Sequence, residues 1–315
     1  MTFASFGELL IDFVAQETGV DVGDASGFIK APGGAPANVA VALARLGENS
    51  AFLGQVGDDP FGRHLASVLQ AQGVNVTGLR FSDEARTALA FVSLRADGDR
   101  SFMFYRHPSA DMLMRPEDVD LEIVRTARVF HYGSITLIGE PSRSATLTAV
   151  EAARAAGAFI SYDPNLRLAL WPSAEAARAG MLAGLELAHF VKISDEELEF
   201  LTGGNSVEPL WRSDLQMIAI THGAHGSTLH TRTERFHHPG YRVEAVDTTG
   251  AGDAFVAGFL AALEQQRRAN AGSIADPAAI LAYANAVGAI TTTRKGAIPA
   301  LPDTAAVNTF LAAQH

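Results

Sequence analysis

Apolar and polar positions along this chain form alternating blocks that predict strands and helices in turn. The nearly continuous apolar run over residues 3–14 predicts a buried first strand, as in parallel sheets that are covered on both faces. Later blocks predict strands at 50–56, 128–133, 159–163, 190–194, 217–221 and 226–231, and helices at 39–46, 60–72, 142–156, 173–187, 195–201, 254–263 and 277–291. Repeated strand and helix units of this kind predict an α/β fold with a mostly parallel, doubly wound sheet.

Two strand-like runs, 87–95 and 100–106, interrupt this alternation. They flank a loop that contains Asp97-Gly98, a strong hairpin signal, so we expect a hairpin that projects from the main sheet. Another alternating run, at 241–246, predicts a half-buried strand. No repeat, linker or low-complexity tract divides the sequence, and we expect one domain over 1–315.

Composition narrows the class of protein. With 315 residues, of which 48% are hydrophobic, the chain is large and apolar enough for a substantial core. A net charge of −11 argues against nucleic acid or an anionic membrane as the main partner. The absence of cysteine excludes disulfides and zinc–cysteine sites, and permits a reducing compartment. The first residues carry Glu8 and Asp12 and no basic leader, so we expect a cytoplasmic protein without a secretory signal.

The segment 247–255 carries the clearest candidate chemistry. Gly250 and Gly252 fall where a long apolar helix begins, and the free N–H groups and dipole of a helix N-terminus stabilise a phosphate. Asp253 would repel that phosphate, so it fits best as a base that accepts a proton from an attacking hydroxyl. On the pattern alone, a glycine turn before a helix more often only marks where the helix begins. A second glycine-rich loop, at 221–226, also follows a strand and favours a nucleotide site.

Other nucleotide-binding patterns are missing from the sequence. No Gly-Lys dipeptide occurs, which excludes a P-loop. No Asp-Phe-Gly or His-Arg-Asp occurs, which excludes the protein-kinase pattern. Phe255 takes the place of the third glycine in a dinucleotide fingerprint, so a Rossmann cofactor site is the weaker interpretation.

Several segments resemble a known family. Gly33-Gly34-Ala35-Pro36-Ala37-Asn38, together with 54–59, resembles the first signature of the ribokinase-like (pfkB-type) carbohydrate kinases, and 247–255 resembles the second. More narrowly, the segments 7–13, 86–92, 102–106 and 161–167 are similar to fructokinases of plants and bacteria. The resemblance covers essentially the whole chain. It implies a three-layer ribokinase-like fold with a small β-sheet lid formed by 13–32 and 87–106.

The resemblance also implies roles for single residues. Asp253 would be the base, and the N–H groups of Gly250, Ala251 and Gly252 would form the anion hole. The positions that match sugar contacts, or that lie in the matching lid and loop segments, are Asp12, Gly33, Gly34, Asn38, Phe104, Arg106, Asn165 and Arg167. Asp12 also follows from its place near the end of the predicted first strand, because ligands of open α/β sheets bind at that end.

On the nucleotide side, the positions that match ATP contacts are Lys192, Thr221, Gly223, Gly226 and Asn285. Glu197 would contact Mg²⁺ through water, although Ser194 replaces an asparagine that many relatives carry; the acids that open this helix also fit ordinary first-turn residues. A monovalent cation, K⁺, would lie near Asp247, Thr249, Thr291 and Gly296.

The sequence specifies the sugar substrate and the oligomeric state less closely than it specifies the fold. Phosphorylation of fructose to fructose 6-phosphate is the main interpretation, with 2-keto-3-deoxygluconate, ribose or a nucleoside as alternative acceptors, and a non-catalytic sensor as the alternative class. Relatives that bind 2-keto-3-deoxygluconate use arginines near Arg106 and Arg167, but Arg106 also fits a solvated strand residue.

His222 and His225 lack further ligands at metal spacing and indicate no metal site. We expect the lid hairpin to carry one apolar face, formed by Leu89, Phe91, Phe102 and Phe104, which a homodimer through the lid or the substrate would cover.

Overall fold

A nine-stranded sheet forms the centre of the computed structural model, which describes residues 3–94 and 100–314. The strand order is β13-β12-β11-β10-β9-β8-β1-β4-β5. The strands from β11 to β5 in this order run parallel, and β12 and β13 are antiparallel at one edge. Their bounds are β1 Phe3–Phe6, β4 Ser50–Gly57, β5 Leu79–Ser82, β8 Val129–Gly133, β9 Phe159–Asp163, β10 Phe190–Ser194, β11 Met217–Thr221, β12 Ser227–His230 and β13 Arg235–His238.

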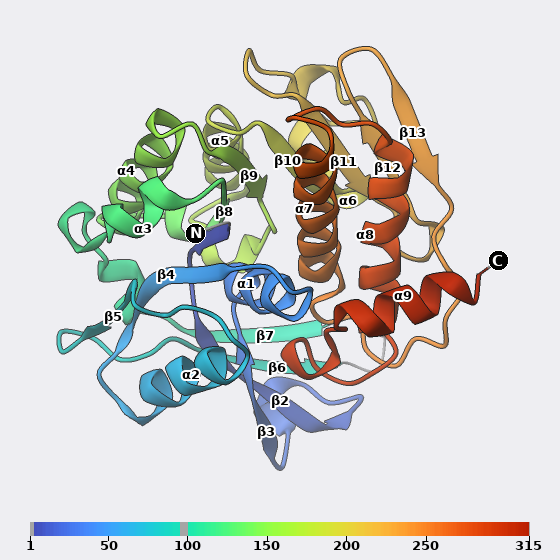
Figure 1. Ribbon diagram of the computed structural model, residues 1–315. Helices are drawn as coiled ribbons and strands as arrows, with labels where there is room; N and C mark the ends of the chain where they lie inside the picture. The colour runs from blue at the N-terminus through green and yellow to red at the C-terminus, as the bar shows by residue number, and fades with distance from the viewer. Residues whose placement is uncertain (1–2, 95–99, 315) are drawn as a thin grey trace.

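Helices cover both faces of this sheet (Figure 1). One hydrophobic core joins one face to α1 (Ala35–Arg45), α2 (Pro60–Ala71), α7 (Ala251–Ala269), α8 (Pro277–Thr291) and α9 (Thr304–Ala312). A second core joins the other face to α3 (Leu121–Thr126), α4 (Ser142–Ala155), α5 (Ala174–Leu185) and α6 (Asp195–Thr202). This arrangement is the expected three-layer, doubly wound fold. Among the described residues, no helix is long and apolar enough to cross a membrane.

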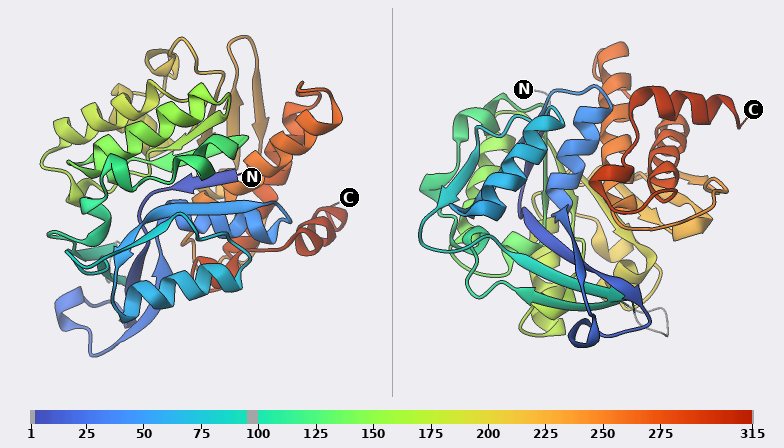
Figure 2. Two further views of the ribbon diagram at one scale, coloured as in Figure 1. Left: turned by 60° about the vertical axis from the view of Figure 1, so that its left-hand side comes forward. Right: turned by 90° about the horizontal axis from the view of Figure 1, so that it is seen from below.

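A separate small sheet lies beside the main one, at the lower end of the view in Figure 1 and again in Figure 2. Its order is β3-β2-β6-β7, with bounds β3 Phe28–Gly33, β2 Leu10–Thr18, β6 Leu89–Leu94 and β7 Arg100–Tyr105. The predicted hairpin is present as the antiparallel pair β6 and β7, and its predicted turn, 96–99, lies outside the described residues. The predicted lid ranges, 13–32 and 87–106, contain most of this sheet, and its action as a lid stays a prediction.

Strand alternation divides the apolar residues of the small sheet between its two faces. Phe91 lies on the face that carries Phe13, and the two rings stack 5.0 Å apart. On the opposite face the register aligns Ile29, Val14, Val92 and Phe102 in one row. The expectation that Leu89, Phe91, Phe102 and Phe104 form one apolar face is therefore wrong, because residues of odd and even number on paired strands point to opposite sides.

The predicted first strand is also wrong in its extent. β1 ends at Phe6, residues 7–9 cross between the sheets, and β2 begins at Leu10 in the small sheet. Asp12 therefore lies in the small sheet and not at the end of a main-sheet strand. Both strands begin with buried apolar residues, so hydrophobicity alone does not reveal the change of sheet.

The residues 241–246, predicted as a strand, form no strand in this described segment. Val246 N–H instead donates to the carbonyl of Thr292, which ties the segment to the loop after α8. Four further elements outside the lid ranges were not predicted: the strands β5 and β13, and the helices α3 and α9.

Candidate active site

The turn that opens α7 forms the centre of the candidate site. Gly250 precedes the helix with φ of 77°, in the left-handed region that favours glycine. A Cβ at Gly250 would lie 2.7 Å from the Cβ of Ala297, so the close approach of the next loop also requires glycine. Ala251 and Gly252 follow in the first turn, where backbone N–H groups have no partner within the helix. The predicted anion hole thus has a helix N-terminus as its frame.

Asp253 lies in the same turn and is buried. Asn38 Nδ2, in the first turn of α1, donates to Asp253 Oδ2 at 2.7 Å. Burial raises the pKa of Asp253 to about 6, and the charge of Asp163 adds to this, while the Asn38 hydrogen bond, Lys192 and Arg167 oppose it. A carboxylate with this pKa is ionised at neutral pH but remains basic enough to accept a proton.

A buried ion pair stands next to this carboxylate. Lys192 Nζ, on β10, lies 3.2 Å from Asp163 Oδ2 at the end of β9. Burial alone would lower the pKa of Lys192, but Asp163, Glu197 and Asp253 raise it above its ordinary value. Lys192 Nζ also lies 3.2 Å from the point where a Cβ on Gly252 would stand. The ammonium group is therefore held, charged, beside the predicted anion hole.

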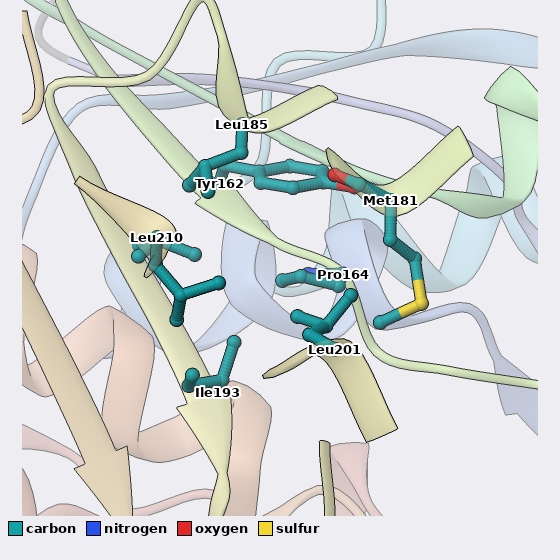
Figure 3. A pocket seen from close by; sticks show the side chains of 8 residues that line it. Tyr162, Pro164, Met181, Leu185, Ile193, Leu201 and Leu210 are labelled. Carbon is teal, nitrogen blue, oxygen red and sulfur yellow. The ribbon is translucent and has the colours of Figure 1, made fainter. Parts of the chain in front are cut away.

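Asp163 was not among the predicted site residues. A signal for it existed, since it ends a buried strand at the carboxyl edge of the sheet, where ligands bind. Asn165 N–H donates to Asp163 Oδ1 at 3.1 Å, and Asn165 itself adopts φ of 47°. Behind this turn, on the other face of the sheet, Tyr162, Pro164 and Met181 line a small apolar pocket (Figure 3). Its lining has no charged group, so we interpret it as packing that supports the turn.

The small sheet brings two predicted sugar contacts to one face. The register aligns Ala31, Asp12, Ala90 and Phe104 in a row across all four strands. A Cβ on Gly33 would lie 2.1 Å from Asp12 Oδ2, so the carboxylate lies directly against the backbone of Gly33. Gly34 follows with φ of 115°, and α1 begins at Ala35. Asp12, Gly33 and Gly34 thus lead directly into the helix that carries Asn38.

The two predicted arginines differ in environment. Arg106 is buried and donates through Nε and Nη2 to Asp111 Oδ2, at 2.8 and 2.6 Å. The alternative of a solvated strand residue is therefore wrong, because this ion pair compensates the charge inside the protein. Arg167 is half-buried, and its charge lowers the pKa of Asp253, which places it near the base.

Glu197 is fixed by its own helix. It forms a capping box with Ser194 at the start of α6, in which Ser194 N–H donates to Oε2 at 2.8 Å. Leu166 N–H donates to Oε1 at 2.7 Å, which joins Glu197 to the loop of Arg167. Each carboxylate oxygen keeps a further lone pair, which fits an outer contact to Mg²⁺ through water. That role stays a prediction.

The predicted nucleotide residues lie around the loop after β11. Gly223 and Gly226 both have positive φ, and a Cβ on Gly226 would lie 2.0 Å from the carbonyl oxygen of His238. Asn285 Nδ2, on α8, donates to Ser227 Oγ at 2.6 Å and to the carbonyl of Leu281 at 2.7 Å. Thr221 Oγ1 reaches the carbonyl of Ile193 at 3.4 Å. These bonds fix the loop between β11, β12 and α8, and contact with ATP stays a prediction.

A groove of about 980 Å³ runs along α6, β11 and β12 on the other side of that loop. His222 lines it, with Nε2 at 3.0 Å from Thr228 Oγ1 and Nδ1 at 3.6 Å from Asp195 Oδ2. The predicted nucleotide residues Thr221, Gly223, Gly226 and Asn285 are not part of its lining.

The predicted cation residues meet near the end of α8. Asp247 Oδ1 accepts from Thr249 N–H and Oγ1 at 2.9 and 2.6 Å, and Oδ2 accepts from Gly296 N–H at 2.8 Å. Thr291 is buried and donates to the carbonyl of Val287. Among residues 3–94 and 100–314, no group of three or more His, Cys, Asp or Glu side chains could hold a metal ion. A cation here would depend largely on carbonyl and hydroxyl oxygens, which suit a monovalent ion.

Comparison with known proteins agrees with this geometry. The profile of the pfkB family carbohydrate kinases matches residues 2–304. The chain is 54% identical to the probable fructokinase-4 of Arabidopsis thaliana over 315 residues, which covers 98% of this chain and 95% of the relative. It is similar in structure, with a TM-score of 0.91 and 38% identity, to the fructokinase of Xylella fastidiosa with bound ATP, over 99% of this chain and 98% of that one. A double mutant of the Vibrio cholerae O395 fructokinase, in a form with fructose, ADP and potassium ion, has a TM-score of 0.85 and 35% identity, with 98% of each chain covered.

Proposed function

The chain belongs to the pfkB family of carbohydrate kinases, and we propose that it is a fructokinase that transfers the γ-phosphate of ATP to the 6-hydroxyl of fructose. The observation that carries the proposal is the buried Asp253 at the start of α7, bonded to Asn38 and flanked by Lys192. Fructose as the acceptor is supported by the names of the relatives, among them a chain 54% identical to this one.

The residues of the site divide the reaction between them. Asp253 accepts the proton of the 6-hydroxyl as its oxygen attacks the γ-phosphorus, and the bond from that phosphorus to the bridging oxygen breaks to release ADP. The N–H groups of Gly250, Ala251 and Gly252, together with Lys192, stabilise the charge that develops on the transferred group. Asp12 and Asn38 hold sugar hydroxyls, and the small sheet closes over the sugar as a lid that excludes water.

Two cations complete the proposal. Glu197 would hold Mg²⁺ through water, and the ion would supply positive charge that neutralises the phosphates of ATP. K⁺, which the Vibrio cholerae structure holds, would lie beside Asp247 and Thr249, with Thr291 and Gly296 supplying carbonyl oxygens.

The cytoplasm, where ATP is supplied, remains the location that the sequence favours.

One alternative acceptor is weakened by the geometry. A kinase for 2-keto-3-deoxygluconate needs an arginine free to bind a carboxylate in a bidentate manner. Arg106 directs Nε and Nη2 to Asp111, so this guanidinium is already committed. Arg167 alone would then have to supply the carboxylate site.

A coupled assay for ADP release tests the proposal. Purified protein with ATP and Mg²⁺ should turn over fructose with a higher kcat/KM than ribose, a nucleoside or 2-keto-3-deoxygluconate. A higher value for another sugar would contradict the choice of fructose, and sugar binding without any turnover would indicate a sensor.

The Asp253→Asn variant tests the base directly. We expect kcat to fall roughly 10²- to 10⁴-fold, because amide nitrogen and oxygen do not accept the proton, while fructose binding stays measurable by calorimetry. Asp276→Asn, at the N-cap of α8, is the matched control, since its carboxylate only accepts from Ala279 N–H. Near-normal kcat in Asp253→Asn would contradict the mechanism.

We further propose a homodimer through the small sheet. Val14, Ile29 and Phe102 form an exposed apolar row on the same face as Asp12 and Phe104. A second copy of the sheet would cover this row and border the sugar site. Sedimentation velocity should show a dimer at micromolar concentration, and Ile29→Lys should convert it to a monomer. A monomeric wild-type protein would contradict the proposal.

A further inference from the structure

Four connections join the two sheets, and they meet at one buried cluster of charges. The chain enters the small sheet at 7–9 and at 83–88, and leaves it at Gly34 and after Tyr105. Glu8 lies in the first connection, and Arg106 begins the last. Both side chains are buried, as is that of Asp111, the partner of Arg106. Glu8 plays no part in the chemistry proposed above, so its burial requires another explanation.

Glu8 acts as the missing cap of α1. Gly34 occupies the N-cap position and has no side chain to accept a hydrogen bond. Glu8 Oε1 instead accepts from Ala35 N–H at 3.0 Å. The carbonyl oxygen of Glu8 would lie 2.3 Å from a Cβ on Gly34, so the backbone of Glu8 also contacts this junction. Two groups of one residue thus define where α1 begins.

The other two connections are joined to the same place. Ala110 N–H donates to the carbonyl of Arg86 at 2.8 Å, which links the exit from β7 to the entry into β6. Gln55 Nε2 donates to the carbonyl of Ala110 at 2.7 Å, which fixes both to β4 of the main sheet. The charges of Arg106 and Asp111 act on Glu8, with Arg106 favouring its ionised form.

A short path leads from Glu8 to the base. Asn38 N–H donates to the carbonyl of Gly34 at 2.9 Å, in the first turn that Glu8 caps. The amide of Asn38 then donates to Asp253. Asn38 Oδ1 is buried and has no hydrogen-bond partner within the described residues, as expected of an acceptor that faces a substrate hydroxyl. A shift of the first turn of α1 would therefore move a sugar contact and the base together.

We propose that Glu8 is a positioning residue of this kinase: with Arg106 and Asp111 it holds the small sheet to the start of α1, and so fixes Asn38 against Asp253. The expected effect of Glu8 on the kinetics rests on the proposed function, but its expected effect on the structure of α1 does not. Burial raises the pKa of Glu8 to about 7, with Arg106 lowering it and Asp111 raising it. The charge that supports the cap therefore changes near neutral pH.

Steady-state kinetics test the kinetic consequence. Glu8→Ala should raise the KM for fructose about tenfold and lower kcat, with little change in the KM for ATP, because a charged hydrogen bond to the α1 junction is lost. Glu8→Gln keeps an acceptor for Ala35 N–H and should recover most of the loss. The wild-type KM for fructose should rise modestly as pH falls from 8 to 6, towards the value of Glu8→Gln, which should stay flat.

Glu264→Gln is the matched control. Glu264 is also a buried glutamate in ion pairs, with Arg128 and Arg267, but lies in the C-terminal half of α7. It should destabilise the protein without changing the KM for fructose. A fructose KM in Glu8→Ala equal to that of the wild type, or an equal rise in Glu264→Gln, would overturn the proposal.

Hydrogen exchange separates this proposal from the proposed function. Without any ligand, residues 35–38 should exchange faster in Glu8→Ala than in the wild type or Glu264→Gln. Unchanged protection would overturn the positioning role even if the wild type phosphorylates fructose. Loss of protection in Glu8→Ala, combined with a wild-type protein that does not turn over fructose, would retain the structural role of Glu8 and reject only the substrate. If Glu8→Ala does not fold, Glu8→Asp supplies the exchange comparison, because its carboxylate is one methylene shorter and should not reach Ala35 N–H.

Discussion

Asp253 shows how a single carboxylate is adjusted for its role. Its neighbours act in opposite directions, since burial and Asp163 raise its pKa whereas Asn38, Lys192 and Arg167 lower it. The balance, about 6, leaves most molecules ionised at neutral pH while keeping the oxygen more basic than that of an exposed aspartate. In the proposed reaction, the same buried charges that shift the pKa would also surround the transferred phosphoryl group.

The pH dependence of kcat/KM follows from this value. The base must be ionised, so kcat/KM for fructose should fall as pH decreases through about 6, approaching a tenfold loss per pH unit below it. Glu8→Gln should retain this acid limb, which separates it from the titration of Glu8. An acid limb that lies near pH 4 would show that Asp253 is not buried in the free enzyme.

At the scale of elements, a strong hydrophobic periodicity was sufficient to predict a helix or strand that packs in a single environment. The helix predicted at 60–72 appears as α2, because Asp59 caps it and Pro60 opens it. The prediction of one strand over 3–14 was wrong, because the run contains two strands that belong to different sheets. The point at which the chain passes from one sheet to the other depends on where α1 packs. Residues 241–246 alternate as a strand does, yet their backbone bonds go to the loop after α8. Such outcomes depend on distant partners that no local pattern contains.

The candidate site likewise contains residues that a local sequence pattern predicts and residues that it does not. Asp253 and its glycines could be predicted because they are contiguous and open a helix. The hydrogen bond between Asn38 and Asp253 joins residues far apart in the sequence; the resemblance to a family implied that both belong to the site but did not predict this bond. The sequence left the burial of Arg106 open, because its partner, Asp111, lies in a short 3-10 helix that the hydrophobic pattern does not predict.

Asp59 offers a prediction about how elements are joined. Its carboxylate accepts from Phe61 and Gly62 N–H at the start of α2, and from Thr87 N–H and Oγ1 just before β6. Asp59→Ala should destabilise the protein by about 2–4 kcal/mol, the sum of a lost cap and an unsatisfied buried N–H. Asp303→Ala removes the cap of α9, an exposed hydrogen bond from Ala306 N–H, together with a charge that acts on Arg45, and should cost about 1 kcal/mol. Equal losses in urea unfolding would contradict the joining role of Asp59.

At the scale of the whole molecule, the buried carboxylates make stability and activity respond to pH in opposite directions. A carboxyl group whose pKa is higher in the folded state adds stability below its unfolded pKa, and this is lost as pH rises through the folded value. Glu8, raised from 4.5 to about 7, therefore destabilises the fold most at the alkaline pH where its cap and the base are ionised. Histidines with lowered pKa oppose this trend, and they are His64, His131, His189, His230 and His238.

The difference between two variants isolates the contribution of Glu8, because the histidines are common to both. At pH 6 the neutral carboxyl of Glu8 resembles glutamine, whereas at pH 8 the wild type retains a buried charge, faced by Arg106 and Asp111. The stability of Glu8→Gln relative to the wild type should therefore increase by about 1 kcal/mol from pH 6 to pH 8, or roughly 2 °C in Tm. Glu17→Gln should show no such change, since the hydrogen bond from Ser26 lowers the pKa of Glu17 and keeps it ionised throughout this range. A difference that stays constant between pH 6 and pH 8 in Glu8→Gln would mean that Glu8 titrates like an exposed carboxylate.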